Sequence, residues 1–240
     1  SDRYLNDTQL AMAEGLARLL STELELSELE RQTELATEME LKALQAQINP
    51  HFLFNTINTI AAFIRTDPNE ARRLLRQFGA FYRRTLENAE DLVALERELE
   101  FVATYVELEQ ARFGDRLVYE VDADPALLSM SLPAFMLQPL VENAVGHGMR
   151  GDGSTLTVKV SAYRDGDAVA LSVADDGAGI PAARLPHVLE SGVGRGLGIA
   201  LRNVRDRHRG FFGPESDFAI SSEEGVGTTV RLVIRRPATR

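Results

Sequence analysis

The chain has no cysteine, and positive charge is the scarcer kind of charge in it. Without cysteine it can form no disulfide framework, thiolate nucleophile or cysteine-ligated metal site, which fits a cytoplasmic setting. Its 26 basic and 36 acidic residues give a formal net charge of -10. Binding along nucleic acid or to an anionic membrane surface needs a dense basic face, so neither partner is expected.

Long hydrophobic runs are also missing. The longest apolar stretch, residues 130–141, is interrupted by a serine, a glutamine and two prolines, and it falls far short of a bilayer span. The first ten residues lack the basic start and the apolar core of a secretory signal. The sequence therefore predicts no membrane-crossing segment within these 240 residues.

The amino-terminal part has the pattern of long amphipathic helices. From Ala11 to about Arg65, leucine, methionine and isoleucine recur every three or four residues among glutamate, glutamine and arginine. In the first part the apolar stripe is too narrow for a core of its own. Residues 1–40 are therefore predicted to form a parallel coiled coil that leads into a helical bundle.

Two further helical runs come next. The turn signal at residues 67–69 precedes a periodic stretch that continues to about Leu86, so the chain is expected to fold back on itself. A third run, VALERELEFVATYVELEQARF, ends at Gly114, a natural helix stop. We place a domain boundary at this glycine.

After Gly114 the pattern changes to strands. Five runs rich in β-branched residues are separated by turn signals: LVYEV, TLTVKVSAY, AVALSVAD, FAISS and TTVRLVI. Two helices are expected between them, one from about Ala134 to His147 and one that opens at the run Gly196 to Gly198. Because the elements do not alternate as regular βαβ units, the pattern predicts an α/β sandwich with helices on one face of a mixed sheet.

The run QINPHFLFNTIN holds the most informative histidine. His51 shares a polar strip with Asn55 at helical spacing, while Phe52 points to another face, so the imidazole is expected to face solvent. Pro50 predicts a bend of the helix just before His51. A neutral imidazole is already a nucleophile near neutral pH, since its unperturbed pKa is about 6.5. A lone helical histidine could equally be a solvated or capping residue, and the flanking pattern favours a phosphoacceptor.

A second motif, LVENAVGHG, places Asn143 and His147 one turn apart on an otherwise apolar helix. An amide oxygen that faces a nucleotide can bind Mg²⁺, which bridges phosphate oxygens and neutralises the charge that develops in phosphoryl transfer. Asn143 is therefore predicted as the metal ligand. The alternative is that it only caps or bridges structural elements.

The run VADDGAGI comes directly after a strand, and its carboxylate can accept from the exocyclic amine of adenine. Asp175 is predicted to select adenine, with Gly177 and Gly179 letting the backbone lie close to the flat base. Further along, Thr228 in EEGVGTTVRLVI is expected to contribute to the floor under the adenine. Each of these runs could alone be an ordinary tight turn.

The run GVGRGLGIALRNV is a glycine-rich loop that opens directly into a helix. Free amides at a helix start attract phosphates, so Gly196, Leu197 and Gly198 are predicted to bind the nucleotide phosphates, and Arg195 to add charge. The run matches neither a dinucleotide fingerprint nor a Walker loop, because the downstream acidic residue and the Gly-Lys-Ser/Thr ending are missing.

Together these motifs resemble the sensor histidine kinases, and specifically their LytS-type branch, over about residues 41–236. The resemblance implies a dimerisation and histidine phosphotransfer hairpin at residues 41–113, which pairs with its twin into a four-helix bundle. It implies an ATP-binding domain of the Bergerat (GHKL) fold at residues 114–240, and a signalling helix from an upstream sensory domain at residues 1–40. The whole protein is then expected to be a membrane-anchored bacterial sensor, with this part in the cytoplasm.

Residue by residue, the resemblance makes His51 the phosphoacceptor, Asn143 the Mg²⁺ ligand and Asp175 the adenine reader. It also implies that ATP and Mg²⁺ are bound, that the chain is a homodimer, and that a response regulator, typically with a LytTR domain, accepts the phosphoryl group on aspartate. Two positions depart from the wider pattern. Phe52 replaces the acid that often follows the acceptor histidine, and Gly146 replaces a basic residue near the phosphates. Asn55 is the candidate for orienting His51.

Two alternatives stay open. One is an ATPase clamp related to gyrase, Hsp90 and MutL, which carries a glutamate one turn before the asparagine, where this chain has Pro139. The other is a dimeric signalling scaffold with a degenerate nucleotide site. The intact Asp175, Asn143 and glycine motifs argue against the scaffold.

Overall fold

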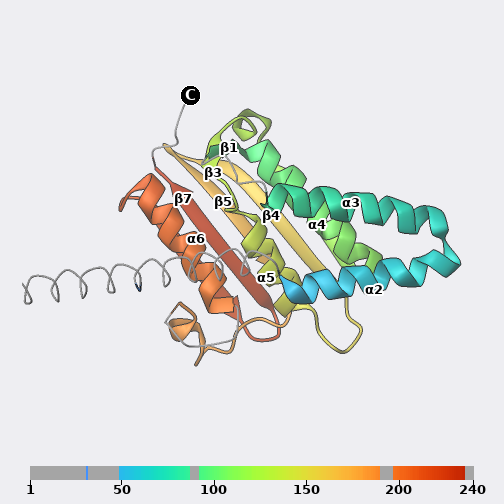
Figure 1. Cartoon of the computed structure of the whole chain (residues 1–240). Coiled ribbons are helices and arrows are strands. Elements are labelled where there is room, and N and C mark those ends of the chain that lie inside the picture. The colour runs from blue at the N-terminus through green and yellow to red at the C-terminus, as the bar shows by residue number, and fades with distance from the viewer. Residues whose placement is uncertain (1–30, 32–48, 87–91, 190–196, 236–240) are drawn as a thin grey trace, which may run out of the picture. The chain divides into compact units, whose positions relative to one another are not determined.

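The computed structural model describes residue 31 and residues 49–86, 92–189 and 197–235 (Figure 1). The coiled coil expected over residues 1–40 lies outside these residues, apart from the helical Arg31. Residues 51–240 form one compact unit, and the predicted site residues that the structure describes belong to it. Among the described residues no helix is both long enough and apolar enough to cross a membrane.

The compact unit starts with a helical hairpin of α2 (Pro50–Thr66) and α3 (Pro68–Leu86). Asp67 ends the first helix and caps the second, because its Oδ1 accepts from the backbone amides of Asn69 and Glu70 at 3.1 and 3.0 Å. Pro50 begins the first helix of this hairpin. It is the first residue of α2 after the non-helical Asn49, a position where a missing N–H removes no helical bond. The bend expected before it would involve residues 41–48, which lie outside the described part.

Helix α4 (Leu95–Phe113) ends where the sequence predicted, at Gly114, whose φ of 61° suits a glycine. Aromatic rings join it to the hairpin. Phe52 packs against Tyr105 with ring centroids 5.0 Å apart, and Phe81 stacks on Phe101 at 4.8 Å. Helix α4 thus contacts the hairpin on one side and strand β2 and helix α5 on another. The domain boundary at Gly114 stays a prediction.

The five predicted strands form one sheet. In chain order they are β2 (Leu117–Ala123), β4 (Leu156–Asp165), β5 (Ala168–Asp175), β6 (Asp217–Glu223) and β7 (Gly227–Ile234). Their order in the sheet is β2-β4-β5-β7-β6, with β2 and β4 parallel and every other pair antiparallel. The expected mixed sheet is therefore confirmed.

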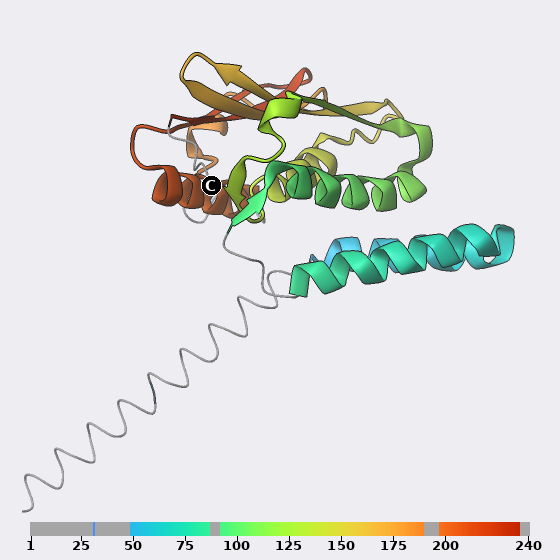
Figure 2. The ribbon, with the colours of Figure 1, turned by 90° about the horizontal axis from the view of Figure 1, so that it is seen from above.

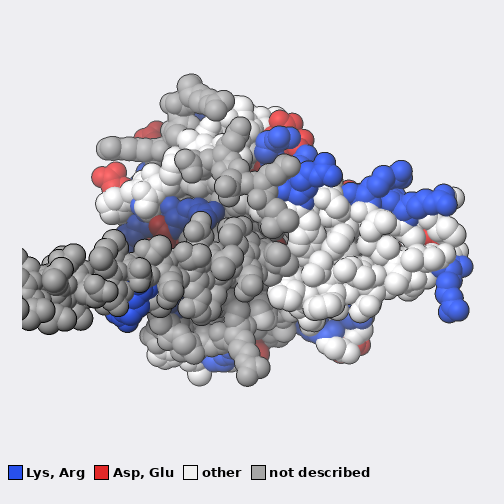
Figure 3. Space-filling view, viewed as in Figure 1, with Lys and Arg blue, Asp and Glu red and all other residues white. Residues whose placement is uncertain are grey.

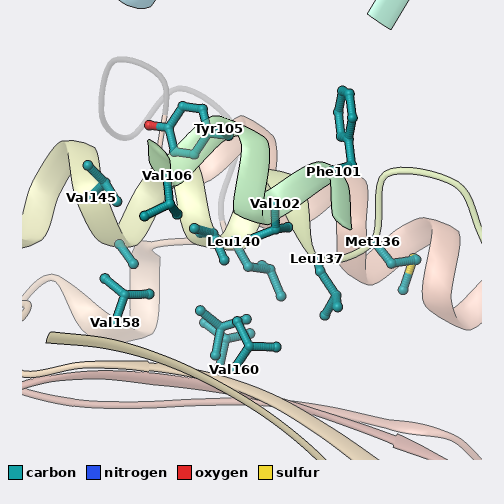
Figure 4. Packing of buried hydrophobic residues seen from close by; sticks show 14 of the residues in the cluster. Phe101, Val102, Tyr105, Val106, Met136, Leu137, Leu140, Val145, Val158 and Val160 are labelled. Carbon is teal, nitrogen blue, oxygen red and sulfur yellow. The ribbon is translucent and has the colours of Figure 1, made fainter. Parts of the chain in front are cut away.

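Helices α4, α5 (Gln138–Gly148) and α6 (Leu197–Phe212) cover one face of this sheet (Figure 2). Their apolar stripes meet the alternating inward residues of the strands, as Figure 4 shows for Val106 of α4, Leu140 of α5 and Val160 of β4. All three of these side chains are buried. The helices that carry the candidate site residues therefore lie on a fixed, well-packed platform.

Some local structure differs from the sequence prediction. A small antiparallel pair, β1 (Leu92–Ala94) with β3 (Ser131–Pro133), was not expected, and three short 3-10 turns cover Gly114–Arg116, Pro125–Leu127 and Leu185–His187. The helix expected from Ala134 begins instead at Gln138. Phe135 has a φ of 60°, which no helix tolerates, so the chain turns before the helix can start.

Candidate functional site

A pocket lies where α5 and α6 approach the sheet at β5 and β7. It has about 450 Å³ of empty space when open solvent is included. Most of its lining is apolar, and the exceptions are four polar side chains that the sequence singled out. The lining residues are Leu140, Asn143, Ala144, His147, Gly148, Val173, Asp175, Gly179, Ile180, Leu201, Thr228 and Val230.

Asn143 reaches this pocket from α5. Its neighbours Val141, Ala144 and Val145 are buried in the core, which fixes the face of the helix that Asn143 occupies. The amide nitrogen is buried and has no hydrogen-bond partner among the described residues. A buried polar atom without a partner costs about 1–3 kcal/mol, so this amide has a strong tendency to bind a polar ligand.

Asp175 is the last residue of β5 and lines the pocket from the sheet. Its Oδ1 accepts from the backbone amide of Gly177 at 3.0 Å. Burial raises the pKa of this carboxyl group from 3.8 to about 6, although backbone hydrogen bonds from Gly177 and Thr228 act in the opposite direction. The result is a hydrogen-bond acceptor held in place in a half-buried position.

The glycines beside Asp175 have a structural role that the sequence did not reveal. A Cβ on Gly177 would lie 2.3 Å from the Cα of Gly148 in α5, and a Cβ on Gly179 would lie 2.0 Å from the carbonyl oxygen of Glu223. Both contacts are with the protein backbone, and only Gly179 lines the pocket. These glycines therefore allow the loop after β5 to pack tightly between α5 and the β6–β7 turn.

Thr228 lines the pocket from the start of β7. Its hydroxyl oxygen lies 2.8 Å from that of Ser222, which in turn accepts from the backbone amide of Ile180 at 2.8 Å. His147 also lines the pocket, one turn after Asn143. Partial burial lowers the pKa of its imidazole, and the positive charge of Arg184 lowers it further.

The predicted phosphate loop is only partly described. Gly198 lies near the start of α6, and Leu197 is the first residue of that helix. Arg195 and Gly196 lie outside the described residues. Their part in phosphate binding stays a prediction.

His51 lies at the start of α2 with an exposed side chain, as the sequence predicted. Asn55 is next to it, its amide nitrogen 3.1 Å from Nδ1 and 3.3 Å from Nε2 of the ring. Phe52, by contrast, is only 3% exposed and packs on aromatic rings of α3 and α4. The backbone at this point therefore anchors one side chain in the core and leaves the adjacent imidazole accessible.

Two residues that matter at the site were missed from the sequence. Glu98 of α4 is 4% exposed, and its carboxylate accepts from the backbone amides of Phe135, Met136 and Leu137 just before α5. Burial raises its pKa. The signal available was its position on the buried stripe of α4, three residues after Leu95. Arg150 donates to the backbone carbonyls of Asp176, Gly177 and Gly225. No local sequence pattern predicts such contacts.

Comparisons with known proteins place two parts of the chain in known families. Residues 39–117 match the histidine kinase family, and residues 132–238 match the histidine kinase-, DNA gyrase B- and HSP90-like ATPase family. Sensor protein LytS of Bacillus subtilis is 43% identical over 233 residues, covering 96% of this chain and 39% of that protein. Sensor protein LytS of Bacillus anthracis is 42% identical over 239 residues, covering 96% of this chain and 41% of that protein.

A solved structure is also similar: the histidine kinase domain of the blue-light activated histidine kinase of Erythrobacter litoralis EL346. It is 20% identical with a TM-score of 0.44, and the match covers 81% of this chain and 92% of that one. The present chain spans about two fifths of the length of the curated relatives that it matches.

Proposed function

Since the chain belongs to the LytS-type sensor histidine kinases, we propose that it is the kinase core of a two-component sensor. It binds ATP in the pocket between α5, α6 and the sheet, transfers the terminal phosphoryl group to His51, and passes that group to an aspartate of a response regulator. One observation carries the proposal above all. The half-buried carboxylate of Asp175 and the unpartnered amide nitrogen of Asn143 line the same pocket, and the exposed His51 lies outside it on the helical hairpin.

The pocket fits a purine nucleotide in its chemistry. Apolar side chains such as Val173, Ile180 and Val230 give a surface for a flat base, and Asp175 gives an acceptor for an exocyclic amine. Guanine carries a carbonyl where adenine carries this amine, so the carboxylate would repel it. The site therefore selects ATP over GTP.

The transfer itself forms a bond between a ring nitrogen of His51 and the γ-phosphorus, and breaks the bond from that phosphorus to the β–γ bridging oxygen. ADP leaves with the electron pair of the broken bond. The attacking nitrogen must carry a lone pair, and the proton on the other ring nitrogen is released to solvent once the bond to phosphorus forms. The amide nitrogen of Asn55 lies within hydrogen-bonding distance of both ring nitrogens, so it can orient the ring. Phe52 cannot act as a base. Among the described residues, the polar side chain that contacts the His51 ring is that of Asn55, and solvent reaches the rest of the ring.

Magnesium fits the donor set only together with the nucleotide. Among the described residues no group of three or more histidine or acidic side chains could hold a metal ion. Asn143 would supply one ligand, and phosphate oxygens and water would supply the others, as is usual for Mg²⁺. When bound, the ion neutralises the phosphate charge that Gly146, lacking a side chain, leaves unopposed.

His51 is not among the residues that line the pocket. Transfer therefore requires either that the nucleotide-binding sandwich moves relative to the hairpin or that a second subunit presents its own histidine. Movements of this kind commonly limit the rates of kinases.

The exposed surface of the hairpin supports a homodimer. Phe54, Ile64 and Leu75 are 65%, 60% and 58% exposed, and Ile57 joins them. Figure 3 shows this side of α2 and α3 largely free of charged side chains, with basic residues along its edges. Two such faces can bury each other as a four-helix bundle. Ile64→Glu should then lower the dimer fraction in sedimentation, while the control Val121→Glu, on exposed β2, should leave it unchanged.

The partner of the chain is a response regulator, because a phosphohistidine can pass its phosphoryl group to an aspartate carboxylate. We propose a regulator with a LytTR domain, as the resemblance of the sequence motifs implies. The whole sensor would be anchored in the membrane by segments outside this chain.

The ATPase clamp needs a glutamate that activates water, and the described residues do not support one. Pro139 stands where such proteins carry this glutamate, and Glu142 accepts from Gln138 at 2.6 Å.

The test is incubation with γ-labelled ATP and Mg²⁺. A label on the protein that is labile in acid and stable in base, and that is missing in His51→Gln, is the expected result. Free phosphate without labelled protein would indicate the ATPase clamp. If neither labelled protein nor free phosphate forms, the chain is a scaffold and the proposal is overturned.

A further inference from the structure

Arg150 lies directly beyond α5, outside the residues that line the pocket. Its Nη2 lies 2.6 Å from the carbonyl oxygen of Gly225, 2.7 Å from that of Gly177 and 3.1 Å from that of Asp176. One guanidinium thus joins the end of α5 to two other segments, the loop after β5 and the turn between β6 and β7. Hydrogen bonds from a charged donor are stronger than those between neutral groups.

The backbone of Arg150 is itself held in place. Arg116 donates from its Nη2 to the backbone carbonyl of Arg150 at 3.1 Å. Two backbone bonds reinforce the same junction: Ala178 donates to Gly148 at 3.0 Å, and Gly225 donates to Ala178 at 2.8 Å. The three segments therefore meet in a continuous hydrogen-bonded network next to the pocket.

The network ends at the base-reading carboxylate. Gly177 has its carbonyl bound by Arg150, and its amide donates to Oδ1 of Asp175. Gly177 has no side chain because its backbone lies against Gly148, so this residue cannot be held by packing of a side chain of its own. Arg150 therefore holds the loop from the outside, together with the backbone bonds of Ala178, and through Gly177 it acts on the direction of the Asp175 carboxylate.

We propose that Arg150 is a positioning residue for base recognition: it holds the loop after β5 so that Asp175 meets the exocyclic amine of adenine. This inference deepens the proposed function and rests on it. Arg150 acts through Gly177, so it should affect discrimination between bases more than affinity for the phosphates. A residue that only supported the fold would affect all nucleotides alike.

The experiment measures dissociation constants for ATP and for purine riboside triphosphate, which lacks the exocyclic amine, by displacement of a fluorescent nucleotide. Arg150→Ala should weaken ATP binding about tenfold and the binding of the other nucleotide much less, so that the preference for ATP shrinks. Arg150→Lys, with one ammonium in place of the planar fork, should recover part of the preference. The matched control is Arg164→Ala on β4, since Arg164 is exposed and makes no side-chain hydrogen bond or ion pair with the described residues.

An equal loss of affinity for both nucleotides, or no loss, would overturn the positioning role. If Arg150→Ala shows no cooperative unfolding and so is not properly folded, Arg150→Lys takes its place. The same ratio of the two dissociation constants then decides the question. Asp175→Asn separates this inference from the proposed function. If that variant keeps the full preference for ATP, the adenine site itself is wrong, and the role of Arg150 falls with it.

Discussion

Asn55 lies one helical turn after His51, and its side-chain amide is the described group that hydrogen-bonds the exposed imidazole. The pair is arranged along a single helix, so its geometry depends only on the local backbone of α2. The orientation of the His51 ring is therefore set within α2 itself.

Replacing Asn55 with alanine should therefore slow autophosphorylation without changing affinity for ATP. Loss of one orienting group typically costs about 10- to 100-fold in rate. The comparison is with Asn58→Ala, because Asn58 is exposed on the same helix and its side chain makes no hydrogen bond with the described residues. Single-turnover labelling measures the rate. Equal effects of the two substitutions would show that Asn55 does not orient the ring.

Glu98 is expected to be the main polar support of α5. Glu98→Ala leaves three backbone amides before α5 without an acceptor, two of them buried, so the free energy of unfolding should fall by about 3 kcal/mol. Glu100→Ala is the control, because Glu100 is exposed and its ion pair is a surface pair with Arg97 at 3.7 Å, which contributes little to stability. Urea denaturation compares the two. A loss for Glu98→Ala no larger than for the control would contradict this role.

Asp175 gives a stability that depends on pH. Its pKa is raised from 3.8 to about 6 in the folded chain, so the folded state binds the proton more tightly than the unfolded state. The stability that this provides is full below pH 3.8 and is lost as the pH rises through about 6. Asp175→Asn carries no charge to bury, and at about pH 7.5 it should be more stable than the unsubstituted chain by on the order of 1 kcal/mol, after allowance for partial exposure.

This gain should shrink toward zero near pH 4, where the carboxyl group is already protonated in the folded state. At neutral pH the same variant should lose ATP binding. Denaturation at several pH values, together with nucleotide titration, measures both effects. A stability difference that is the same at both ends of the pH range would show that burial of the charge is not its cause.

Two glycines near the pocket should respond in opposite ways to alanine. Gly146 lies in α5 with nothing within 4 Å of its added Cβ, so Gly146→Ala should raise the free energy of unfolding by about 0.5–1 kcal/mol. In Gly177→Ala the Cβ would lie 2.3 Å from the Cα of Gly148, so the loop must shift. ATP binding should fall in Gly177→Ala and persist in Gly146→Ala. If Gly177→Ala binds ATP normally, the loop does not need its close approach to α5.

Much of the architecture was accessible from the sequence because the signals are local. The alternating pattern predicted all five strands of the sheet, and Gly114 predicted the end of α4. The candidate site residues Asn143, His147, Asp175 and Thr228 were named separately and the structure brings them to one pocket. Their roles in binding stay predictions, as do those of Arg195 and Gly196.

The missed features depend on contacts between distant segments. The strands β1 and β3 have three residues each, too few for an alternating pattern, and their pairing joins residues about forty positions apart. Arg150 bonds to carbonyls 27 and 75 residues further along the chain, which no motif records. The turn at Phe135 is stabilised by Glu98, 37 residues away, and it therefore displaced the predicted start of α5.

The decisive test of the proposed kinase activity is the position of the phosphoryl group after incubation with ATP and Mg²⁺, determined by mass spectrometry under conditions that preserve phosphohistidine. We expect one phosphoryl group on the peptide that contains His51, and its absence when Asn143 is replaced by alanine. A phosphoryl group on any other residue, or an unmodified protein that still converts ATP to ADP, would contradict the proposal.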